Sequence, residues 1–342
     1  MRIEEFDFNL PASLIAQYPS SQRGDSRLMV IDRRSGEIQH RAFQDLGDYL
    51  RPGDLVVMNN TRVLPARLLG KKETGGKCEI LLIPSWDGPR EEWEALIKDA
   101  RKIRPGTRIQ FGEGFSGDIL EVKGGKAKIR FTPEGEVMDL VQKFGHIPLP
   151  PYIRRPDEPQ DRERYQTILA EKDGSIAAPT AGLHFTHSLL QSIQARGVHL
   201  TRITLHVGIG TFAPVRVQEI KDHTMETEWV EIPEKVALAI EETKGTGGRV
   251  IAVGTTTTRA LESVADSQGR VKPGQYLARL FIYPGYCFRI IDALITNFHL
   301  PKSTLIMLVS ALVGKDFLMK AYQEAIAKKY RFYSYGDAML IL

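Results

Sequence analysis

Six short segments with strand character follow one another between residues 63 and 145, and turns that contain glycine separate them. Their residues are β-branched or alternate between apolar and polar, as in strands that bury one face. Six short strands at this spacing predict a small antiparallel β-barrel. The expected strands cover residues 66–70, 78–83, 93–97, 107–111, 118–122 and 127–131.

Different patterns flank this region on both sides, where apolar runs typical of buried strands alternate with amphipathic stretches typical of helices. They predict an α/β main domain, a mixed sheet with flanking helices, formed by residues 1–62 and 149–342. Residues 63–148 are then an inserted small antiparallel β-barrel domain. The proline-rich residues 145–159 are expected to bring the chain back along the surface as a stiff connection. The expected strands include 54–58, 201–207, 249–253 and 293–296, and the expected helices are 188–196, 234–244, 261–265, 303–313 and 317–329.

Polar side chains gather where three of the expected strands end, at residues 59–62, 254–259 and 296–299. Hydroxyls, amides and arginines at strand ends suit a ribose, a carboxylate or a phosphate. The four threonines from Thr255 to Thr258 exceed what one helix cap needs, although capping and strand packing explain them equally well.

A further polar segment, residues 177–186, lies between a short apolar run and the helix expected from residue 188. Its proline and glycine favour a sharp turn away from the sheet. Thr180, His184 and Thr186 then lie near a helix N-terminus, where free backbone amides can bind an anion. The alternative explanation is that Thr186 caps the helix and that His184 bonds to nearby backbone.

Three histidines, His184, His206 and His299, are candidates for acid–base catalysis, because imidazole exchanges a proton near neutral pH. The histidines and acids of the chain match no zinc motif, so no metal site is predicted. A G-x-G-x-x-A pattern begins at Gly208, but Pro214 follows it where a helix should open. A dinucleotide site is therefore rejected.

Basic residues are concentrated in residues 98–108, where five of them accompany the single acid Asp99, whereas the whole chain has a net charge of +4. Such a patch can bind phosphates. A solvated loop face is the alternative explanation. The basic residues are Lys98, Arg101, Lys102, Arg104 and Arg108.

Composition excludes several classes of protein. The longest apolar run, residues 305–313, is far shorter than the roughly 20 residues of a membrane span, and the acidic N-terminus does not resemble a signal peptide. We therefore expect a cytoplasmic protein without membrane contact. Cys78 and Cys287 can form neither a disulfide framework nor a multi-thiolate zinc site, and both are expected to be buried and inert.

Several longer segments, spread along almost the whole chain, form a highly specific combination. They read N-x-T-R-V-L-P-A-R (59–67), G-H-I-P-L-P-P-Y-I (145–153), A-P-T-A-G-L-H-F-T (178–186), L-H-V-G-x-G-T-F (205–212), G-T-T with the later R and L-E (254–262), T-N-F-H-L-P (296–301), S-T-L (303–305) and Y-S-Y-G-D-A (333–338). In these segments the chain resembles the S-adenosylmethionine:tRNA ribosyltransferase-isomerase family of queuosine biosynthesis. Two positions depart from the family pattern: Asn60, where the family often has Asp, and Glu226, where it often has His.

The resemblance implies a reaction in which S-adenosylmethionine donates its ribosyl group instead of its methyl group. A 7-aminomethyl-7-deazaguanine base at the wobble position of tRNA receives the ribose, which is isomerised to an epoxycyclopentane. Adenine and methionine leave, and the tRNA then carries epoxyqueuosine. Such chemistry needs a base for a proton beside the sulfonium and a proton donor for the departing adenine.

The resemblance and the polar segments together give the expected site. The tRNA is expected to contact the five basic residues of 98–108. S-adenosylmethionine is expected as a substrate, with no permanently bound cofactor and no metal, and the protein as a monomer. The catalytic candidates are His184, as first choice, His206 and His299, and the S-adenosylmethionine-binding candidates are Thr180, Thr211, Thr255, Thr256, Arg259 and Asn297.

Two other functions remain open from the residues alone. The first is a methyltransferase or hydrolase that acts on a free nucleoside. The second is a non-catalytic RNA-binding protein in which the barrel reads the RNA and the α/β part is a scaffold.

Overall fold

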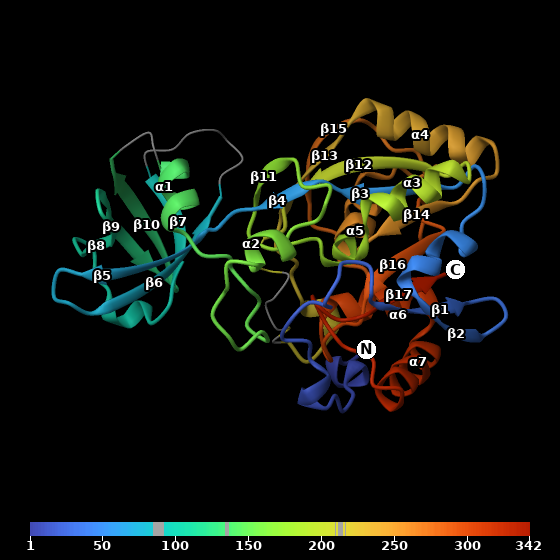
Figure 1. The fold of residues 1–342 in the computed structure, drawn as a ribbon, viewed down its shortest axis with the longest axis horizontal. Helices are drawn as coiled ribbons and strands as arrows, with labels where there is room; N and C mark the ends of the chain where they lie inside the picture. The colour runs from blue at the N-terminus through green and yellow to red at the C-terminus, as the bar shows by residue number, and fades with distance from the viewer. Residues whose placement is uncertain (85–91, 134–136, 209, 211–214, 216) are drawn as a thin grey trace.

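The computed structural model describes residues 1–342 except 85–91, 134–136, 209, 211–214 and 216. Figure 1 shows two parts: a larger α/β part, which holds both chain ends, and a β-barrel that stands to one side of it. The predicted fold class, an α/β part with a small antiparallel barrel, is confirmed.

A mixed sheet of nine strands, counted over the described residues, forms the centre of the larger part in the order β15-β13-β12-β3-β14-β16-β17-β1-β2. Strands β12, β3, β14 and β16 run parallel to one another. Strand β17 runs antiparallel to β16 and parallel to β1, and β2, β13 and β15 are antiparallel to their neighbours. The bounds are β1 Arg27–Asp32, β2 Glu37–Ala42, β3 Leu55–Asn59, β12 His199–Leu205, β13 Glu228–Ile232, β14 Val250–Val253, β15 Gly274–Ala278, β16 Ala293–Asn297 and β17 Ala338–Ile341.

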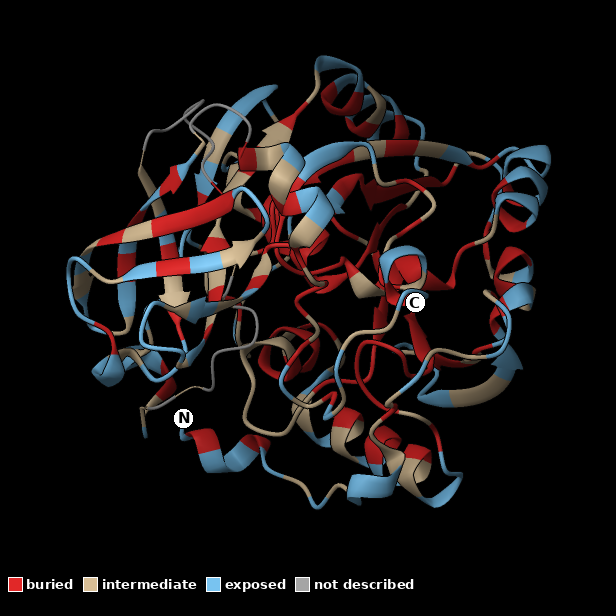
Figure 2. Cartoon of the chain, turned by 60° about the vertical axis from the view of Figure 1, so that its left-hand side comes forward, coloured by how far each residue is buried: buried red, intermediate tan, exposed pale blue. Residues whose placement is uncertain are grey.

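Helices cover both faces of this sheet, so its central strands are apolar throughout. Along β3, Leu55 and Val57 pack into one core with α4, α5, α6 and α7, whereas Val56 and Met58 pack into a second core with η3 and α3. Figure 2 shows the buried residues concentrated at the centre and the exposed ones on the outer faces of the helices. The bounds are η3 Phe43–Tyr49, α3 His187–Ala195, α4 Glu234–Gly245, α5 Thr255–Val264, α6 Thr304–Val313 and α7 Lys315–Ala327.

The barrel is closed, with the strand order β10-β7-β6-β5-β8-β9, and all its pairs are antiparallel. Burial alternates strictly along β10, because every second side chain points into the barrel. Phe115 and Phe131 stack inside, with ring centroids 5.1 Å apart. The bounds are β5 Arg67–Lys72, β6 Lys77–Ile83, β7 Glu92–Ile97, η4 Ala100–Lys102, β8 Arg108–Gly112, β9 Phe115–Lys123, β10 Lys126–Thr132 and the adjoining α1 Val137–Phe144.

Two chain segments join the barrel to the larger part, and they pack against each other. A Cβ atom on Gly145 would lie only 1.9 Å from the carbonyl oxygen of Pro65, so this crossing requires glycine. The first segment leaves β4, Thr61–Val63, which pairs with β11, Lys172–Ser175, in a separate two-stranded sheet. The short helical segments outside the main elements are η1 Ile3–Phe6, η2 Ala12–Leu14, α2 Asp161–Arg164, η5 Thr180–His184 and η7 Ile220–Asp222.

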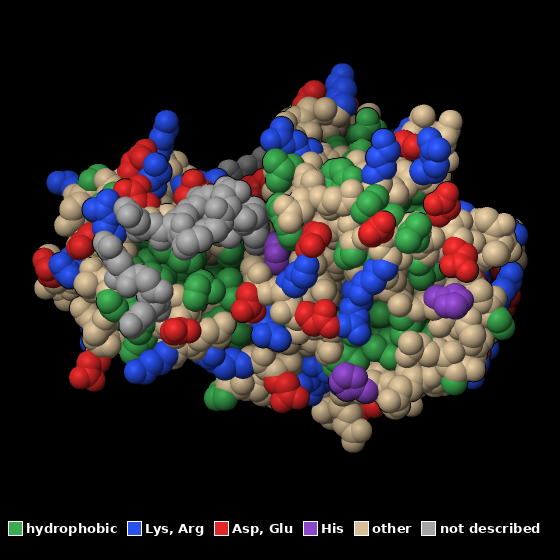
Figure 3. All heavy atoms as spheres, turned by 90° about the horizontal axis from the view of Figure 1, so that it is seen from above, with side chains coloured by type: hydrophobic (Ala, Val, Ile, Leu, Met, Phe, Trp, Pro, Cys, Tyr) green, Lys and Arg blue, Asp and Glu red, His purple; other side chains and the backbone are tan. Residues whose placement is uncertain are grey.

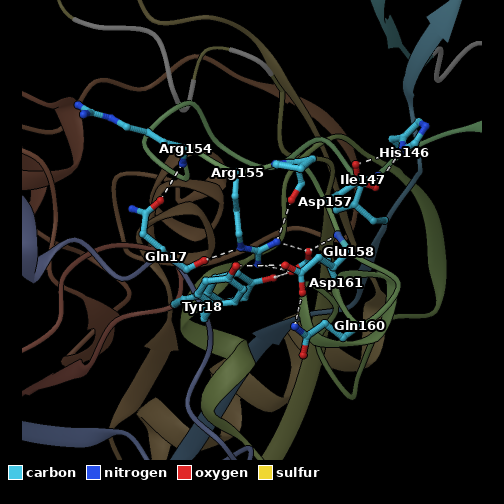
Figure 4. Close-up of polar contacts among 12 residues, drawn as sticks. Gln17, Tyr18, His146, Ile147, Arg154, Arg155, Asp157, Glu158, Gln160 and Asp161 are labelled. Atoms are coloured by element: carbon cyan, nitrogen blue, oxygen red, sulfur yellow. Dashed lines mark hydrogen bonds and ion pairs between the residues drawn. The ribbon is translucent and has the colours of Figure 1, made fainter.

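The returning connection is fixed by a buried ion pair (Figure 4). Arg155 donates two hydrogen bonds to Asp161, at 2.6 and 2.8 Å, and its guanidinium lies 4.2 Å from the ring centroid of Tyr18. Pro148 and Pro150 are buried. The predicted surface course therefore fails for Pro148 and Pro150, whereas Pro151, Pro156 and Pro159 are exposed as predicted.

Other predicted elements also differ in the structure. Helix α5 begins at Thr255 and not at residue 261, since Gly254, at φ 94°, turns the chain from β14 directly into the helix. The aromatic C-terminal segment, for which no strand was predicted, forms β17 inside the main sheet. Cys78 is buried as expected, but Cys287 is exposed, because its segment runs over the surface.

Candidate active site

A pocket with about 660 Å³ of empty space opens at the carboxyl ends of β14 and β16, beside η5. Ligands of open α/β sheets bind at this end of the strands. We call it the strand-end pocket. It is lined by Tyr152, Ala178, Pro179, Thr180, Ala181, Val207, Gly254, Thr255, Thr256, Thr296, Asn297, Phe298, His299, Leu300, Ser303, Leu305, Tyr333 and Ser334.

Sequence-predicted site residues from three separate segments meet in this pocket. His184 lies directly behind it, Arg259 lines a smaller neighbouring pocket, and His206 lies elsewhere on the sheet. Thr211 falls outside the described residues. The predicted residues that line the pocket are Thr180, Thr255, Thr256, Asn297 and His299.

Asn297 organises the hydrogen bonds of the pocket floor. Its Nδ2 donates to Nε2 of His184 at 3.0 Å and to the backbone oxygen of Tyr333 at 3.1 Å. Its Oδ1 accepts a hydrogen bond from Oγ1 of Thr180 at 3.0 Å. Three partners, two from η5 and one from the C-terminal segment, therefore fix the orientation of this amide.

His184 is buried and neutral. Burial lowers its pKa to about 4, so the ring is uncharged at neutral pH. Because Nε2 accepts from Asn297, the ring proton is on Nδ1 and is donated to Oγ of Ser26 at 2.7 Å. The ring also packs against Phe43, with centroids 5.0 Å apart. Both ring nitrogens thus hold neighbouring side chains in place.

His299 is the histidine that lines the pocket itself. Its Nε2 is 2.8 Å from Oγ1 of Thr296, and its backbone N–H donates to the hydroxyl of Tyr322 at 2.9 Å. Burial lowers its pKa to about 3, so this ring is also neutral at neutral pH. A neutral imidazole in a water-poor pocket can donate or accept a hydrogen bond without a charge to solvate.

The third polar strand end, residues 59–62, does not reach the strand-end pocket. Asn59 donates from Nδ2 to the backbone oxygen of Leu205 at 2.8 Å, which ties β3 to β12. Thr61 bonds to Nδ1 of His206 at 2.7 Å, and the His206 ring stacks on Trp229 with centroids 5.0 Å apart. Burial lowers the pKa of His206 to about 4. These side chains join the end of β3 to the edge of the sheet.

The barrel carries a separate groove with about 1360 Å³ of empty space. Leu69 and Phe111 contribute apolar surface to it. We call it the basic groove, after the five lysines in its lining: Lys71, Lys72, Lys77, Lys98 and Lys102.

The predicted basic patch of 98–108 is only partly gathered there. Lys98 and Lys102 line the groove, where their ammonium groups lie 3.3 Å from Glu79 and Asp99 respectively. The rest of the patch lies outside the lining: Arg108 is 3.6 Å from Asp118, whereas Arg101 and Arg104 are exposed and have no ion-pair partner among the described residues. In Figure 3 basic and acidic side chains are interspersed over the face shown.

The sequence matches the family described as "Queuosine biosynthesis protein" over residues 3–341. The chain belongs to this family. It is 50% identical over 345 residues to an S-adenosylmethionine:tRNA ribosyltransferase-isomerase of Syntrophotalea carbinolica and 54% identical over 346 residues to that of Symbiobacterium thermophilum, each match covering 100% of both chains. A crystal structure of S-adenosylmethionine tRNA ribosyltransferase from Thermotoga maritima is 38% identical, covers 99% of this chain and 100% of its own, and superposes with a TM-score of 0.57.

The queuosine-family segments also contain pocket residues to which the sequence alone assigned no role. Tyr152 comes from the connection and Tyr333 and Ser334 from the C-terminal segment. The Tyr152 hydroxyl lies 2.6 Å from Oγ of Ser334, and the two tyrosine rings lie 4.7 Å apart. Burial raises the pKa of both phenols, so each keeps its proton as a hydrogen-bond donor. The motifs P-P-Y-I and Y-S-Y-G-D-A were the available signal.

The two departures from the family pattern lie outside the strand-end pocket. Asn60 is buried, donates to Glu171 at 3.0 Å and accepts from Thr204 at 2.7 Å. Glu226 is exposed and lines a cleft between the barrel and the larger part, together with Arg67 and Lys98.

The described residues contain no group of three or more histidine, cysteine, aspartate or glutamate side chains placed to hold a metal ion. Within the same residues, every helix is too short or too polar to cross a membrane.

Proposed function

We infer that this chain is an S-adenosylmethionine:tRNA ribosyltransferase-isomerase. It transfers and isomerises the ribosyl group of S-adenosylmethionine to 7-aminomethyl-7-deazaguanine at the tRNA wobble position and releases adenine and methionine. The observation that carries this inference is the end-to-end match, at 50% and 54% identity, to two enzymes of that name. Each match spans the full length of both chains.

We propose that the strand-end pocket holds the adenosyl part of S-adenosylmethionine. Its polar lining from Thr180, Thr255, Thr256 and Asn297 offers donors and acceptors to the ribose hydroxyls. Tyr333 offers ring surface to the adenine. Pocket groups that are already fixed to one another hold the substrate at several points. The substrate therefore loses most of its rotational and translational freedom on binding, and little more in the transition state.

The three histidines receive different roles in this proposal. His299 faces the substrate and takes part in proton transfer, because it is the one that lines the pocket. His184 acts through Asn297, whose amide it orients. His206 positions Thr61 at the end of β3. Thr211 is proposed as an additional contact to S-adenosylmethionine.

The tRNA is proposed to bind across the barrel. Arg101 and Arg104 support this, since both are exposed and without an ion-pair partner among the described residues. Lys98, Lys102 and Arg108 add positive charge. Their ion pairs lie at the surface, so each cation can leave its acidic partner and bind a phosphate instead.

S-adenosylmethionine enters this proposal as a substrate, and no other cofactor stays bound during turnover. We propose a monomeric enzyme that works in the cytoplasm, where its tRNA substrate is found. Size-exclusion chromatography with light scattering tests the monomer, and a mass of two chains contradicts it.

One assay separates the proposed function from its alternatives. The protein is incubated with S-adenosylmethionine and tRNA that carries the deazaguanine precursor, and the small products are identified by mass spectrometry. Free adenine and methionine in equal amounts, together with a tRNA nucleoside that has gained the ribosyl-derived ring, are the expected result. S-adenosylhomocysteine would indicate a methyltransferase, and binding without any product would indicate an RNA-binding protein.

A further inference from the structure

A smaller pocket, which we call the side pocket, adjoins the strand-end pocket. It shares Thr255, Thr256 and Leu305 with its larger neighbour. Most of its other lining is apolar, including Met225 and Phe281. The side pocket is therefore a mostly apolar extension of the strand-end pocket, and Thr255 and Thr256 lie where the two pockets meet.

One cation, Arg259, lines this mostly apolar space. Its side chain is 9% exposed and forms an ion pair with the buried Glu228. Burial lowers the pKa of Arg259 to about 10, so the guanidinium stays charged at neutral pH. Its Nε–H is buried and has no hydrogen-bond partner in the described part of the chain. A buried donor of a cation without an acceptor is costly, so a bound acceptor accounts for it better than an empty pocket.

The first turn of α5 points toward the same place. Gly254 precedes the helix and has no side chain that could cap it, whereas Ser303 caps α6 by accepting a hydrogen bond from the backbone N–H of Ile306. The amides of the first turn of α5 are therefore not capped by a side chain. Thr255 and Arg259 are four residues apart and lie on one face of the helix. Helix dipole, hydroxyl and guanidinium together favour an anion there.

We propose that Arg259 and the first turn of α5 bind the carboxylate of the methionyl part of S-adenosylmethionine in the side pocket. This inference rests on the proposed function, which places the adenosyl part in the strand-end pocket. The methionyl methylenes then contact the apolar lining, and the sulfonium lies near the wall that both pockets share. Methionine, the second leaving product, would depart from a compartment separate from that of adenine.

The test compares S-adenosylmethionine with its decarboxylated analogue, which keeps the adenosyl group, the sulfonium and the amine. Adenine release is measured with saturating precursor tRNA, and the ratio of kcat/KM for the two donors is determined. The wild-type enzyme is expected to prefer the carboxylate about 10- to 100-fold, the range for a hydrogen bond to a charged group. In the double variant Arg259→Gln, Glu228→Gln, the preference is expected to fall to within about threefold of unity.

The double variant removes both charges of the buried pair and so avoids an uncompensated buried carboxylate. A matched control is Arg249→Gln with Asp54→Asn, a pair of a half-buried arginine and a buried aspartate joined at 2.6 Å at the opposite end of β14. This control is expected to lose stability while it retains the wild-type preference for S-adenosylmethionine.

The failures are distinguishable. Equal use of both donors by the wild-type enzyme, or an unchanged preference in a folded Arg259 and Glu228 variant, overturns the inference and leaves the proposed function intact. A wild-type protein that neither binds S-adenosylmethionine nor releases adenine overturns the proposed function, and this inference with it.

Discussion

The strand-end pocket and the basic groove use polar residues in opposite ways. In the pocket, His184 and His299 are buried, neutral and bonded to fixed neighbours. On the barrel, Lys98 and Lys102 are 70% and 74% exposed and pair with the half-buried Glu79 and the exposed Asp99. A buried polar network depends on each member, whereas screened surface charges act as a group. A single substitution in the pocket should therefore lower activity strongly. On the barrel, several substitutions together should be needed to weaken tRNA binding.

The largest expected effect concerns two Arg–Asp pairs, one in each part of the molecule. Arg155 and Asp161 are 9% and 0% exposed, whereas Arg108 and Asp118 are 45% and 39% exposed. Asp161→Asn should lower the unfolding free energy by about 3–5 kcal/mol, because it leaves a buried arginine uncompensated. Asp118→Asn should lower the unfolding free energy by only about 0–1 kcal/mol, because its ion pair is exposed to solvent. Urea unfolding of both variants measures the difference, and equal losses would contradict the contrast.

Asn297→Asp should lower kcat/KM for adenine release about 100-fold, the cost of a misplaced reacting group. The aspartate keeps the shape of the side chain but loses the N–H groups that bond to His184 and to the Tyr333 backbone oxygen. The matched control is Thr180→Ser, which keeps the hydroxyl that Asn297 accepts from and should retain most of the activity. A folded Asn297→Asp enzyme with near wild-type turnover would show that the amide network does not position the substrate.

The buried histidines should also make stability depend on pH. Burial lowers the pKa of His184, His206 and His299 to about 4, 4 and 3, whereas the unfolded chain binds these protons below about pH 6.5. Acidification from pH 6.5 to 4 therefore favours unfolding, by about 1.4 kcal/mol per pH unit for each histidine. His184→Gln removes one of these histidines, so the slope of the unfolding free energy against pH should become shallower by about 1.4 kcal/mol per pH unit.

Reversal of Arg101, Lys102 and Arg104 to Glu should weaken tRNA binding about 10-fold or more at 0.15 M salt. It should also reduce the slope of log affinity against log salt by up to about three, since each lost phosphate contact removes nearly one. Fluorescence anisotropy over a salt series measures both quantities.

A control variant carries the same change of net charge on the larger part. Lys235, Lys320 and Lys328 are exposed there, and their reversal to Glu should alter the salt slope far less. Equal slopes for the two triple variants would remove the barrel patch from the tRNA interface.

The barrel could be predicted from sequence because its signal is local. Burial alternates along single strands such as β10, so the pattern can be read without knowledge of the rest of the fold. The last strand of the main sheet was harder to predict: β17 contains only four residues in an aromatic segment, and its place between β16 and β1 depends on tertiary pairing.

The pocket could be predicted only in part, because its properties arise between distant segments. Thr255, Asn297 and His299 were found from the composition of strand ends. Tyr152 and Tyr333 could not be placed without the path of the connection and of the C-terminus. The hydrogen bond between His184 and Ser26 likewise joins residues that are 158 positions apart in the chain.

A crystal structure with S-adenosylmethionine and an anticodon stem-loop that carries unmodified guanine, which lacks the reactive amine, tests the central claim most directly. The account predicts adenosyl density in the strand-end pocket in contact with Asn297, methionyl density toward Arg259, and the stem-loop phosphates along the barrel. S-adenosylmethionine bound in the basic groove or in the cleft beside Glu226, with the strand-end pocket empty, would contradict it.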